Sequence, residues 1–440
     1  MKRHIIEQLR QWKNSKSRKP LILQGARQVG KTYILTAFGE SEYDNVAYLN
    51  FENTPLLHDL FSGSLKPTDI IKILSIELSV EIKPGKTLII FDEVQACPAA
   101  LNSLKYFNET ANEYHICAAG SLLGVTLANT QGFPVGKVDF LYLYPLCFSE
   151  FLTAKGEDKL IEYINDIKKI EPLPTLLHEK LLTYYKEYLY TGGMPAAVLA
   201  YINSENFEEI RKTHNSILKA YRLDFAKHAP PNIIMKINQI WDVIPSQLAK
   251  ENKKFVYSVI RKGARAQEFE TAIQWLKEAG LIYKVYNIST PKLPLSGYMN
   301  YEIFKIYLCD AGLLGAMANL SAKTIIHDNE IFQEFRGSLV ENYVAQELAR
   351  QQQELFYWTS VGEAELDFLW QYDDKIYPLE VKSGTNTKKK SLLIYTEKYQ
   401  PELQIRVSAM SLKLDGKILN CPLYLLGDLS SLMRTVYSQV

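Results

Sequence analysis

A chain of 440 residues is long enough for two to four domains, and its 47% hydrophobic content is ordinary for a globular protein. The formal net charge of +1 confines any nucleic-acid surface to a local patch. No segment approaches the roughly 20 consecutive apolar residues of a membrane-spanning helix, so we expect no membrane partner. The five cysteines lack paired spacing, which is typical of reduced, buried thiols in a cytoplasmic protein.

The first elements are an amphipathic helix within residues 1–19 and a buried strand at residues 21–23. The pattern G-x-x-x-x-G-K-[ST] follows the strand and is filled by Gly25, Gly30, Lys31 and Thr32. Glycines let backbone N–H groups face phosphate oxygens, the lysine reaches the β/γ-phosphates, and the threonine hydroxyl can ligate Mg²⁺. The sequence therefore predicts an ATP-binding site at the start of a helix over residues 31–38.

An entirely apolar run at residues 87–91 predicts a parallel strand covered on both faces, and it ends in Asp92 and Glu93. Asp92 is expected beside the metal, and Glu93 one step further, facing the attacking water as a base. The alternative is a core strand that ends in two solvated acids. Strands at 46–51, 114–118 and 140–144, with helices between them, extend the prediction to a parallel α/β sheet.

Ser121 follows the strand predicted next to the one that carries Asp92. It could sense the γ-phosphate or cap a helix, and both roles stay open. The residues expected to contact the nucleotide are Gly25, Ala26, Arg27, Gln28, Val29, Gly30, Lys31, Thr32, Tyr33, Asp92 and Ser121.

After the core at 1–150, the pattern predicts a helical lid at 151–230 and a winged-helix-like module at 231–325. Within this module, residues 233 to about 290 are expected to form three helices followed by a hairpin, the wing. The tyrosines of the lid are expected in its core rather than as a stacking platform. DNA is the candidate partner of the winged module, whose cations are Lys253, Lys254, Arg261, Lys262 and Arg265. Acids at 268, 270 and 278 would oppose that contact, and a structural connector is the alternative.

Residues 326–440 carry a second group of charged residues. Glu341 is expected on a helix that begins near Phe335, Asp367 on a strand, and Glu380 and Lys382 on the antiparallel strand that returns from it. Two or three carboxylates could hold Mg²⁺, and the lysine could polarise a metal-bound water for phosphodiester hydrolysis. A solvated salt bridge is the plainer alternative. Asn386 and residues 388–390 could hold a phosphate backbone or simply begin a solvated helix.

With both sites in view, the chain resembles a family of bacterial and archaeal AAA-type ATPases whose C-terminal domain is similar to PD-(D/E)xK nucleases. The matching motifs lie at residues 25–32, 91–95, 144–151, 192–195, 305–314, 341–342, 365–368 and 380–383. The resemblance implies a P-loop ATPase sheet, bound ATP and Mg²⁺, and an α/β restriction-endonuclease-like C-terminal domain. It implies catalytic roles for Lys31, Glu93, Asp367, Glu380 and Lys382, and metal ligands at Thr32, Asp92, Glu341, Asp367 and Glu380.

One departure concerns Gly136 and Lys137, where many relatives carry Gly-Arg. Lysine cannot make the planar bidentate contact of an arginine, so Arg27 could substitute for it. Two functions remain in competition: an ATPase coupled to a Mg²⁺-dependent nuclease acting on DNA, and an ATP-driven switch or scaffold whose C-terminal domain binds nucleic acid or protein without cleavage. A ring-forming homo-oligomer is left open.

Overall fold

The computed structural model describes residues 1–54, 56–63, 65–120, 136–250, 253–326, 333–352, 354–360, 364–384 and 390–439. The chain divides into an N-terminal unit, Met1–Tyr144 with Glu278–Gly280, and a C-terminal unit, Pro145–Lys277 with Leu281–Val440. The segments expected as lid, winged module and nuclease-like domain lie within the second unit, except for Glu278–Gly280 of the winged module. None of the helices in the described ranges is both long and apolar enough to span a bilayer.

The N-terminal unit is built on a sheet whose paired strands are parallel, in the order β2-β3-β4-β1-β5. Its strands are β1 (Leu21–Gln24), β2 (Asn45–Asn50), β3 (Thr87–Asp92), β4 (His115–Ala119) and β5 (Asp139–Tyr142). The predicted parallel α/β sheet is confirmed. Every residue of β3 is buried, as its apolar run predicts for a strand covered on both faces.

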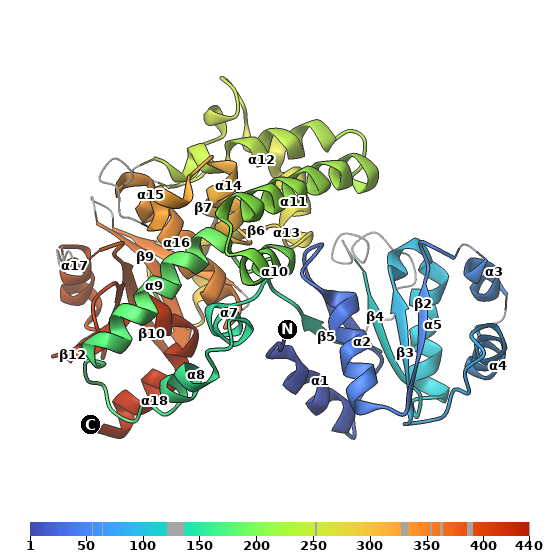
Figure 1. Ribbon diagram of the computed structural model, residues 1–440. Helices are drawn as coiled ribbons and strands as arrows, with labels where there is room; N and C mark the ends of the chain where they lie inside the picture. The colour runs from blue at the N-terminus through green and yellow to red at the C-terminus, as the bar shows by residue number, and fades with distance from the viewer. Residues whose placement is uncertain are drawn as a thin grey trace. The chain divides into compact units, whose positions relative to one another are not determined.

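Helices cover both faces of this sheet, with α1 and α2 on one side and α3 and α4 on the other (Figure 1). They are α1 (Ile5–Asn14), α2 (Lys31–Glu42), α3 (Leu57–Ser62), α4 (Pro67–Glu77) and α5 (Pro98–Thr110). Proline occupies the first position of α4 and of α5, where its missing N–H costs no hydrogen bond. One apolar core joins α3, α4 and α5 to the strands.

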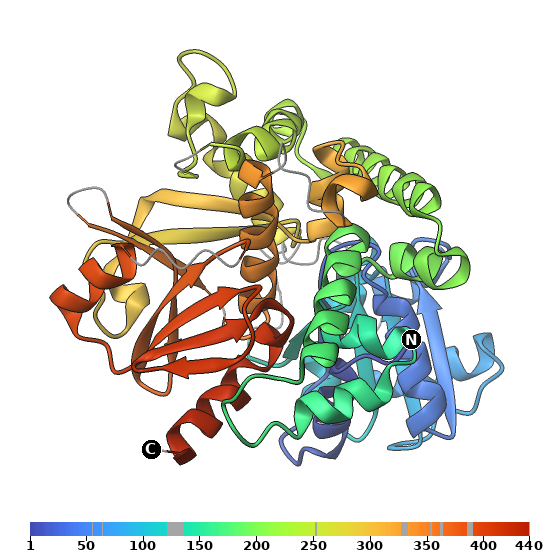
Figure 2. The same ribbon diagram turned by 60° about the vertical axis from the view of Figure 1, so that its left-hand side comes forward.

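The C-terminal unit contains an eight-stranded mixed sheet in the order β12-β13-β11-β10-β9-β8-β6-β7. Its strands are β6 (Ile282–Ile288), β7 (Met299–Leu308), β8 (Leu355–Thr359), β9 (Glu365–Tyr372), β10 (Lys375–Val381), β11 (Gln404–Ser408), β12 (Lys413–Asp415) and β13 (Ile418–Pro422). The β6–β7 hairpin, expected as a wing, continues the strands of the nuclease-like segment (Figure 2). It does so because β6 pairs in parallel with β8, a long-range pairing that local periodicity does not reveal.

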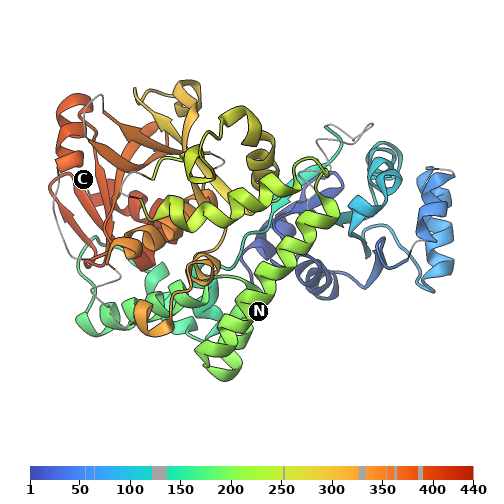
Figure 3. The same ribbon diagram turned by 90° about the horizontal axis from the view of Figure 1, so that it is seen from above.

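Helices make up the rest of this unit, and Figure 3 shows the long α11 leading back into α12. They are α7 (Phe148–Ala154), α8 (Asp158–Asn165), α9 (Thr175–Thr191), α10 (Pro195–Ser204), α11 (Phe207–His228), α12 (Ile234–Leu248), α13 (Ala266–Glu278), α14 (Ala311–Met317), α15 (Ala322–Ile326), α16 (Gln333–Ala349), α17 (Lys390–Tyr399) and α18 (Leu429–Gln439). Of the five tyrosines expected in the core of the lid, Tyr185, Tyr188 and Tyr190 are buried, whereas Tyr184 is half-buried and Tyr163 is exposed. The middle helix predicted for the winged module is only a short 3₁₀ turn at Tyr257–Val259.

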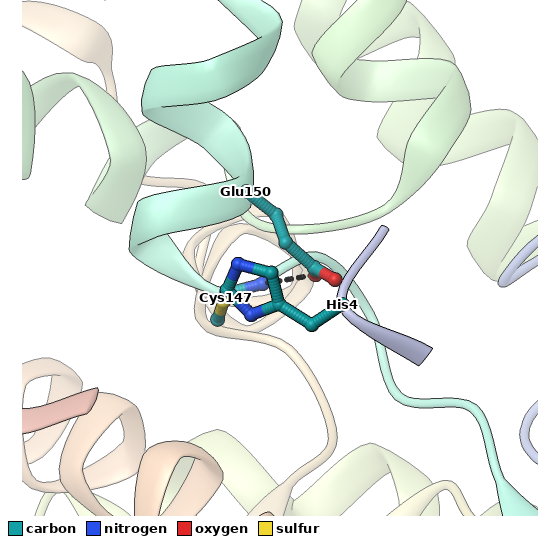
Figure 4. Close-up of side chains that lie close together, drawn as sticks. All are labelled: His4, Cys147 and Glu150. Carbon is teal, nitrogen blue, oxygen red and sulfur yellow. Dashed lines mark hydrogen bonds between the residues drawn. The ribbon is translucent and has the colours of Figure 1, made fainter. Parts of the chain in front are cut away.

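The segment after Pro145 is held by buried polar contacts within the C-terminal unit. Leu146 donates its N–H to the Gly193 carbonyl at 2.7 Å and accepts from the Tyr188 hydroxyl at 2.6 Å. Figure 4 shows Glu150 in the first turn of α7, where its Oε2 accepts from the Cys147 backbone N–H at 3.1 Å. All five cysteines lie among the described residues, and they are buried and form no disulfide, as expected.

Gly193 is required where the turn before α10 meets this segment. A Cβ at Gly193 would lie 2.0 Å from the Leu146 carbonyl oxygen, a backbone atom with no freedom to move aside. We expect Gly193→Ala to lower the free energy of unfolding by about 1–3 kcal/mol, the usual cost of overpacking. Denaturant unfolding followed by tyrosine and tryptophan fluorescence measures this change.

Gly337→Ala is the matched control, because a Cβ at this position in α16 would meet nothing within 4 Å. Within a helix this change should raise stability by about 0.5–1 kcal/mol. Equal stabilities for the two variants would contradict the close packing at Gly193.

Candidate nucleotide-binding site

The phosphate loop, residues 25–32, joins β1 to α2. Gly25 has a φ of +143°, and a Cβ there would lie 2.2 Å from the Leu143 carbonyl oxygen, so only glycine permits this close packing. Helix α2 begins at Lys31, directly after Gly30, as the sequence predicts. The free N–H groups of the first turn and the helix dipole favour an anion at this end.

Lys31 is buried, and its ammonium group donates to the carbonyl oxygens of Gly25 and Ala26, both at 2.9 Å. Burial lowers the pKa of Lys31 to about 8, against the opposing effect of the nearby Glu93 and Asp92 carboxylates. The lysine side chain is thus hydrogen-bonded to its own loop, and its ammonium group loses its proton more readily than that of an exposed lysine. A phosphate anion beside it would restore the charged form.

Asp92 lies at the end of β3 and reaches the first turn of α2. Its Oδ2 accepts hydrogen bonds from the Thr32 hydroxyl at 2.9 Å and the Tyr48 hydroxyl at 2.7 Å. Strand β4 lies between β1 and β3, yet both strands end at the same edge because all of them are parallel. A hydroxyl and a carboxylate in contact, next to an anion site, are the donor set that Mg²⁺ takes with a nucleotide.

Tyr48 was not among the predicted site residues. It lies on β2 (register Asn50 with Asp92), and burial raises the pKa of its hydroxyl to about 12. The hydroxyl therefore stays a donor to Asp92 at neutral pH. In the sequence, Tyr48 is only an aromatic residue in a short predicted strand. That pattern does not predict a hydrogen bond to Asp92.

Glu93 directly follows β3 and has a φ of +48°, in the left-handed region. A non-glycine residue in this region is uncommon and is often found at functional sites. Its Oε2 accepts from the Gln95 side-chain amide at 2.5 Å.

The other predicted contacts are distributed around the loop. Tyr33 is 58% exposed, and its hydroxyl accepts from the Met1 amino group at 3.1 Å. Lys137 forms an ion pair with Glu109 at 3.0 Å. Ser121 lies outside the described residues, as do Asn386, Lys388 and Lys389, so their predicted roles stay predictions.

In the C-terminal unit, the predicted carboxylates lie on the predicted elements. Glu341 is on α16, and Asp367 and Glu380 are on the antiparallel pair β9 and β10. The Val381 N–H donates to Asp367 Oδ2 at 2.7 Å, and Lys382 Nζ lies 2.8 Å from Glu380 Oε1. The other oxygen of Glu380, Oε2, is buried without a hydrogen-bond partner among the described residues.

Two further lysines lie within this acidic group, and neither was predicted there. Lys253 forms an ion pair with Glu341, whose second oxygen accepts from the Tyr307 hydroxyl at 2.9 Å. The fully buried Lys305 forms an ion pair with Glu365. Lys253, one of the proposed DNA-contacting cations, is therefore bound within the protein.

These lysines set the protonation of the acids. Burial alone would raise the pKa of Glu341, but Lys253 and Lys305 hold it below its usual value. Burial and the neighbouring Glu341 charge raise the pKa of Asp367. In the described chain, Glu341, Asp367 and Glu380 do not bring one oxygen each to within 4.8 Å of one another. As they stand, the three carboxylates do not form a single three-ligand site.

Comparison with protein families agrees with the first of these sites. Residues 17–152 match the family described as AAA domain. Residues 182–324 and 336–424 match two families described as domains of unknown function, DUF8612 and DUF4143 respectively. No curated protein sequence matches the chain.

Solved structures show only distant similarity. The Walker-type ATPase PABY2304 of Pyrococcus abyssi is 15% identical, with 71% of this chain and 95% of that one covered at a TM-score of 0.45. The Aeropyrum pernix ORC1 protein in complex with DNA is 12% identical, with coverages of 72% and 93% and a TM-score of 0.31. These similarities do not establish the arrangement of the whole chain or a function. The family match and the geometry of the loop identify residues 17–152 as an AAA-type, ATP-binding domain.

The lowered pKa of Lys31 predicts how nucleotide affinity depends on pH. In the free protein the ammonium group loses its proton as pH rises through about 8, and bound phosphate raises that pKa. Binding above pH 8 must therefore take up a proton, and ATP affinity should fall as pH rises further. Calorimetric titration in buffers of different ionisation enthalpy measures both effects.

Lys105→Met, which removes an exposed lysine from α5, should leave this pH dependence unchanged. A dissociation constant that stays constant between about pH 7 and 9.5 would show that Lys31 does not change protonation on binding.

Proposed function

We propose that the protein hydrolyses ATP and that its C-terminal unit holds a divalent-cation site of the nuclease-like kind. The hydrogen bond between the Thr32 hydroxyl and Asp92 is the main support for ATP hydrolysis. It brings a metal-ligating pair to the N-terminus of α2, beside the buried ammonium group of Lys31. Binding alone would need only the loop, whereas hydrolysis also needs a carboxylate near the γ-phosphate.

The residues divide the reaction between them. Lys31 would leave the carbonyl oxygens of its own loop to pair with the β/γ-phosphates, and Thr32 and Asp92 would hold Mg²⁺. When bound, Mg²⁺ neutralises charge on the phosphate oxygens. Glu93 accepts a proton from, or orients, the attacking water once its carboxylate separates from Gln95.

Glu93→Gln tests the catalytic role. The amide keeps the size of the side chain but cannot accept the proton, so turnover should fall by about 10²–10⁴-fold while ATP affinity stays near wild type. Phosphate release measures turnover, and titration with a fluorescent ATP analogue measures affinity.

Glu77→Gln makes the same change at an exposed position at the end of α4 and should leave both quantities unchanged. If Glu93→Gln retains full turnover, another group activates the water and the assignment of Glu93 is wrong.

For the C-terminal unit, we propose that Asp367 and Glu380 bind a divalent cation. Asp367 keeps one oxygen on the Val381 N–H, and Glu380 has a buried oxygen, Oε2, without a hydrogen-bond partner in the described residues. A buried carboxylate oxygen without a donor is costly, and a cation would offset that cost. Mg²⁺ is commonly bound through one or two carboxylates with waters in its remaining positions.

The lysines argue for the second candidate function, an ATP-driven switch. Lys253, Lys305 and Lys382 each pair with one glutamate, at positions 341, 365 and 380 respectively. This pairing neutralises most of the negative charge that would attract a metal. A domain whose acids serve mainly to hold its own lysines could bind nucleic acid or protein without cleaving it. Lys262 and Arg265 remain exposed as candidate DNA contacts.

Manganese binding to three variants separates these alternatives. Asp367→Asn removes one proposed ligand charge and should weaken Mn²⁺ binding about tenfold or more, the scale of losing one charge-assisted contact. Lys253→Met removes an ammonium group that competes for Glu341, and should strengthen Mn²⁺ binding. Calorimetry or electron paramagnetic resonance of free Mn²⁺ measures both.

Asp374→Asn, at the exposed turn between β9 and β10, is the matched control and should bind Mn²⁺ as wild type does. Incubation of plasmid and single-stranded DNA with Mg²⁺ is the second readout. Cleavage that disappears in Asp367→Asn and Lys382→Ala supports the nuclease. Metal binding without cleavage favours the switch, and identical Mn²⁺ binding by all variants contradicts the metal site.

A further inference from the structure

Arg3 connects the phosphate loop to the end of the N-terminal unit. The side chain is 8% exposed, its Nη1 donates to the Val29 carbonyl at 3.1 Å, and its Nη2 donates to the Tyr144 carbonyl at 2.6 Å. A guanidinium presents several N–H donors in one rigid plane, so a single side chain can hold two backbone oxygens in a fixed relation.

Helix α1 fixes the position of Arg3 within this unit. The Arg3 carbonyl accepts from the Ile6 N–H at 3.2 Å, next to the start of the helix. Ile5, Leu9 and Trp12 bury the apolar face of α1. Lys13 of α1 also donates to the Glu42 carbonyl at the end of α2. The guanidinium is therefore held next to an element that contacts α2, the helix that begins at the end of the loop.

Its first partner, Val29, lies within the phosphate loop immediately before Gly30. The peptide that joins them is planar, and in a trans peptide the N–H points opposite to the carbonyl. Holding the Val29 oxygen therefore also sets the direction of the Gly30 N–H, one of the donors expected to face phosphate. Arg3 therefore holds this peptide by the Val29 carbonyl and leaves the Gly30 N–H available to the nucleotide.

Its second partner, Tyr144, ends a segment that already contacts the loop. Leu143 donates to the Gln24 carbonyl at 2.8 Å, and its own carbonyl is the atom packed against Gly25. Pro145, the next residue, begins the C-terminal unit, where its carbonyl accepts from Arg350 at 2.9 Å. The chain that leaves the ATP-binding unit is therefore hydrogen-bonded on both sides of the Tyr144–Pro145 peptide.

We infer that Arg3 is a positioning residue for the nucleotide, and that it couples the conformation of the phosphate loop to residues 143–146. This inference rests on the proposed ATP site. When phosphate binds, the Val29–Gly30 peptide is held from both sides, and the same guanidinium restrains Tyr144. Without Arg3, the loop and the connecting segment respond to ATP independently.

Arg3→Ala and Arg3→Lys test this inference against Arg10→Ala, which removes an exposed arginine from α1. Arg3→Ala should weaken the binding of a fluorescent ATP analogue about tenfold or more, because two charge-assisted hydrogen bonds are lost. Arg3→Lys keeps the positive charge but not the planar guanidinium, so its ATP affinity should lie between those of wild type and Arg3→Ala. Arg10→Ala should stay within about twofold of wild type, as expected for a surface ion pair.

Hydrogen exchange gives a readout that a merely structural role would not change. ATP should slow the exchange of peptides covering residues 142–147 in wild type and Arg10→Ala, and this effect should disappear in Arg3→Ala. If Arg3→Ala does not fold, Arg3→Lys decides the same question.

Wild-type affinity and wild-type exchange in the Arg3 variants would overturn the inference. If the wild-type protein itself binds no ATP, the proposed function fails instead, and the two failures are distinguished by the wild-type titration.

Discussion

The hydrogen bond between Thr32 and Asp92 depends on one constraint, the parallel alignment of the strands in the N-terminal sheet. Because β1 and β3 both end at the same edge, the residues that follow them meet there although β4 lies between the strands. The loop, the N-terminus of α2 and the acidic end of β3 then share one small volume. Removing the alignment would separate the phosphate loop from the proposed metal ligand Asp92 without changing a single motif.

A second constraint, in the C-terminal unit, explains motifs that carry no evident chemistry. The buried Asp310 carboxylate accepts from the Gly193 N–H at 2.6 Å and from the Leu313 N–H at 2.9 Å. Gln346 accepts from the Ala311 N–H at 3.1 Å and donates to the Tyr188 hydroxyl at 2.7 Å. Segments distant in sequence are therefore joined by side chains that satisfy buried backbone groups, which would otherwise cost free energy. The Gly-Gly turn and the residues around Asp310 serve as this junction.

The acidic group on α16, β9 and β10 shows why charged motifs are ambiguous. A metal and an ammonium group satisfy the same carboxylates, and both make a buried acid tolerable. Here lysines at 253 and 305 reach the group from other elements, so its charge is balanced by the fold rather than by the motif. The unpartnered Glu380 oxygen among the described residues is the feature that still favours a cation.

The sequence by itself determined the features that depend on residues close together in the chain. The glycines and Lys31 of the phosphate loop, the buried run that ends in Asp92, and the β9–β10 hairpin all follow from patterns within a few residues. The hairpin turns at Asp373 and Asp374, which take left-handed conformations with φ of 49° and 56°. Tertiary structure decided the contacts between distant segments: Tyr48 with Asp92, Lys253 with Glu341, Arg3 with Val29, and β6 with β8. These depend on which elements pack together, and periodicity specifies the buried face of an element without specifying its neighbour.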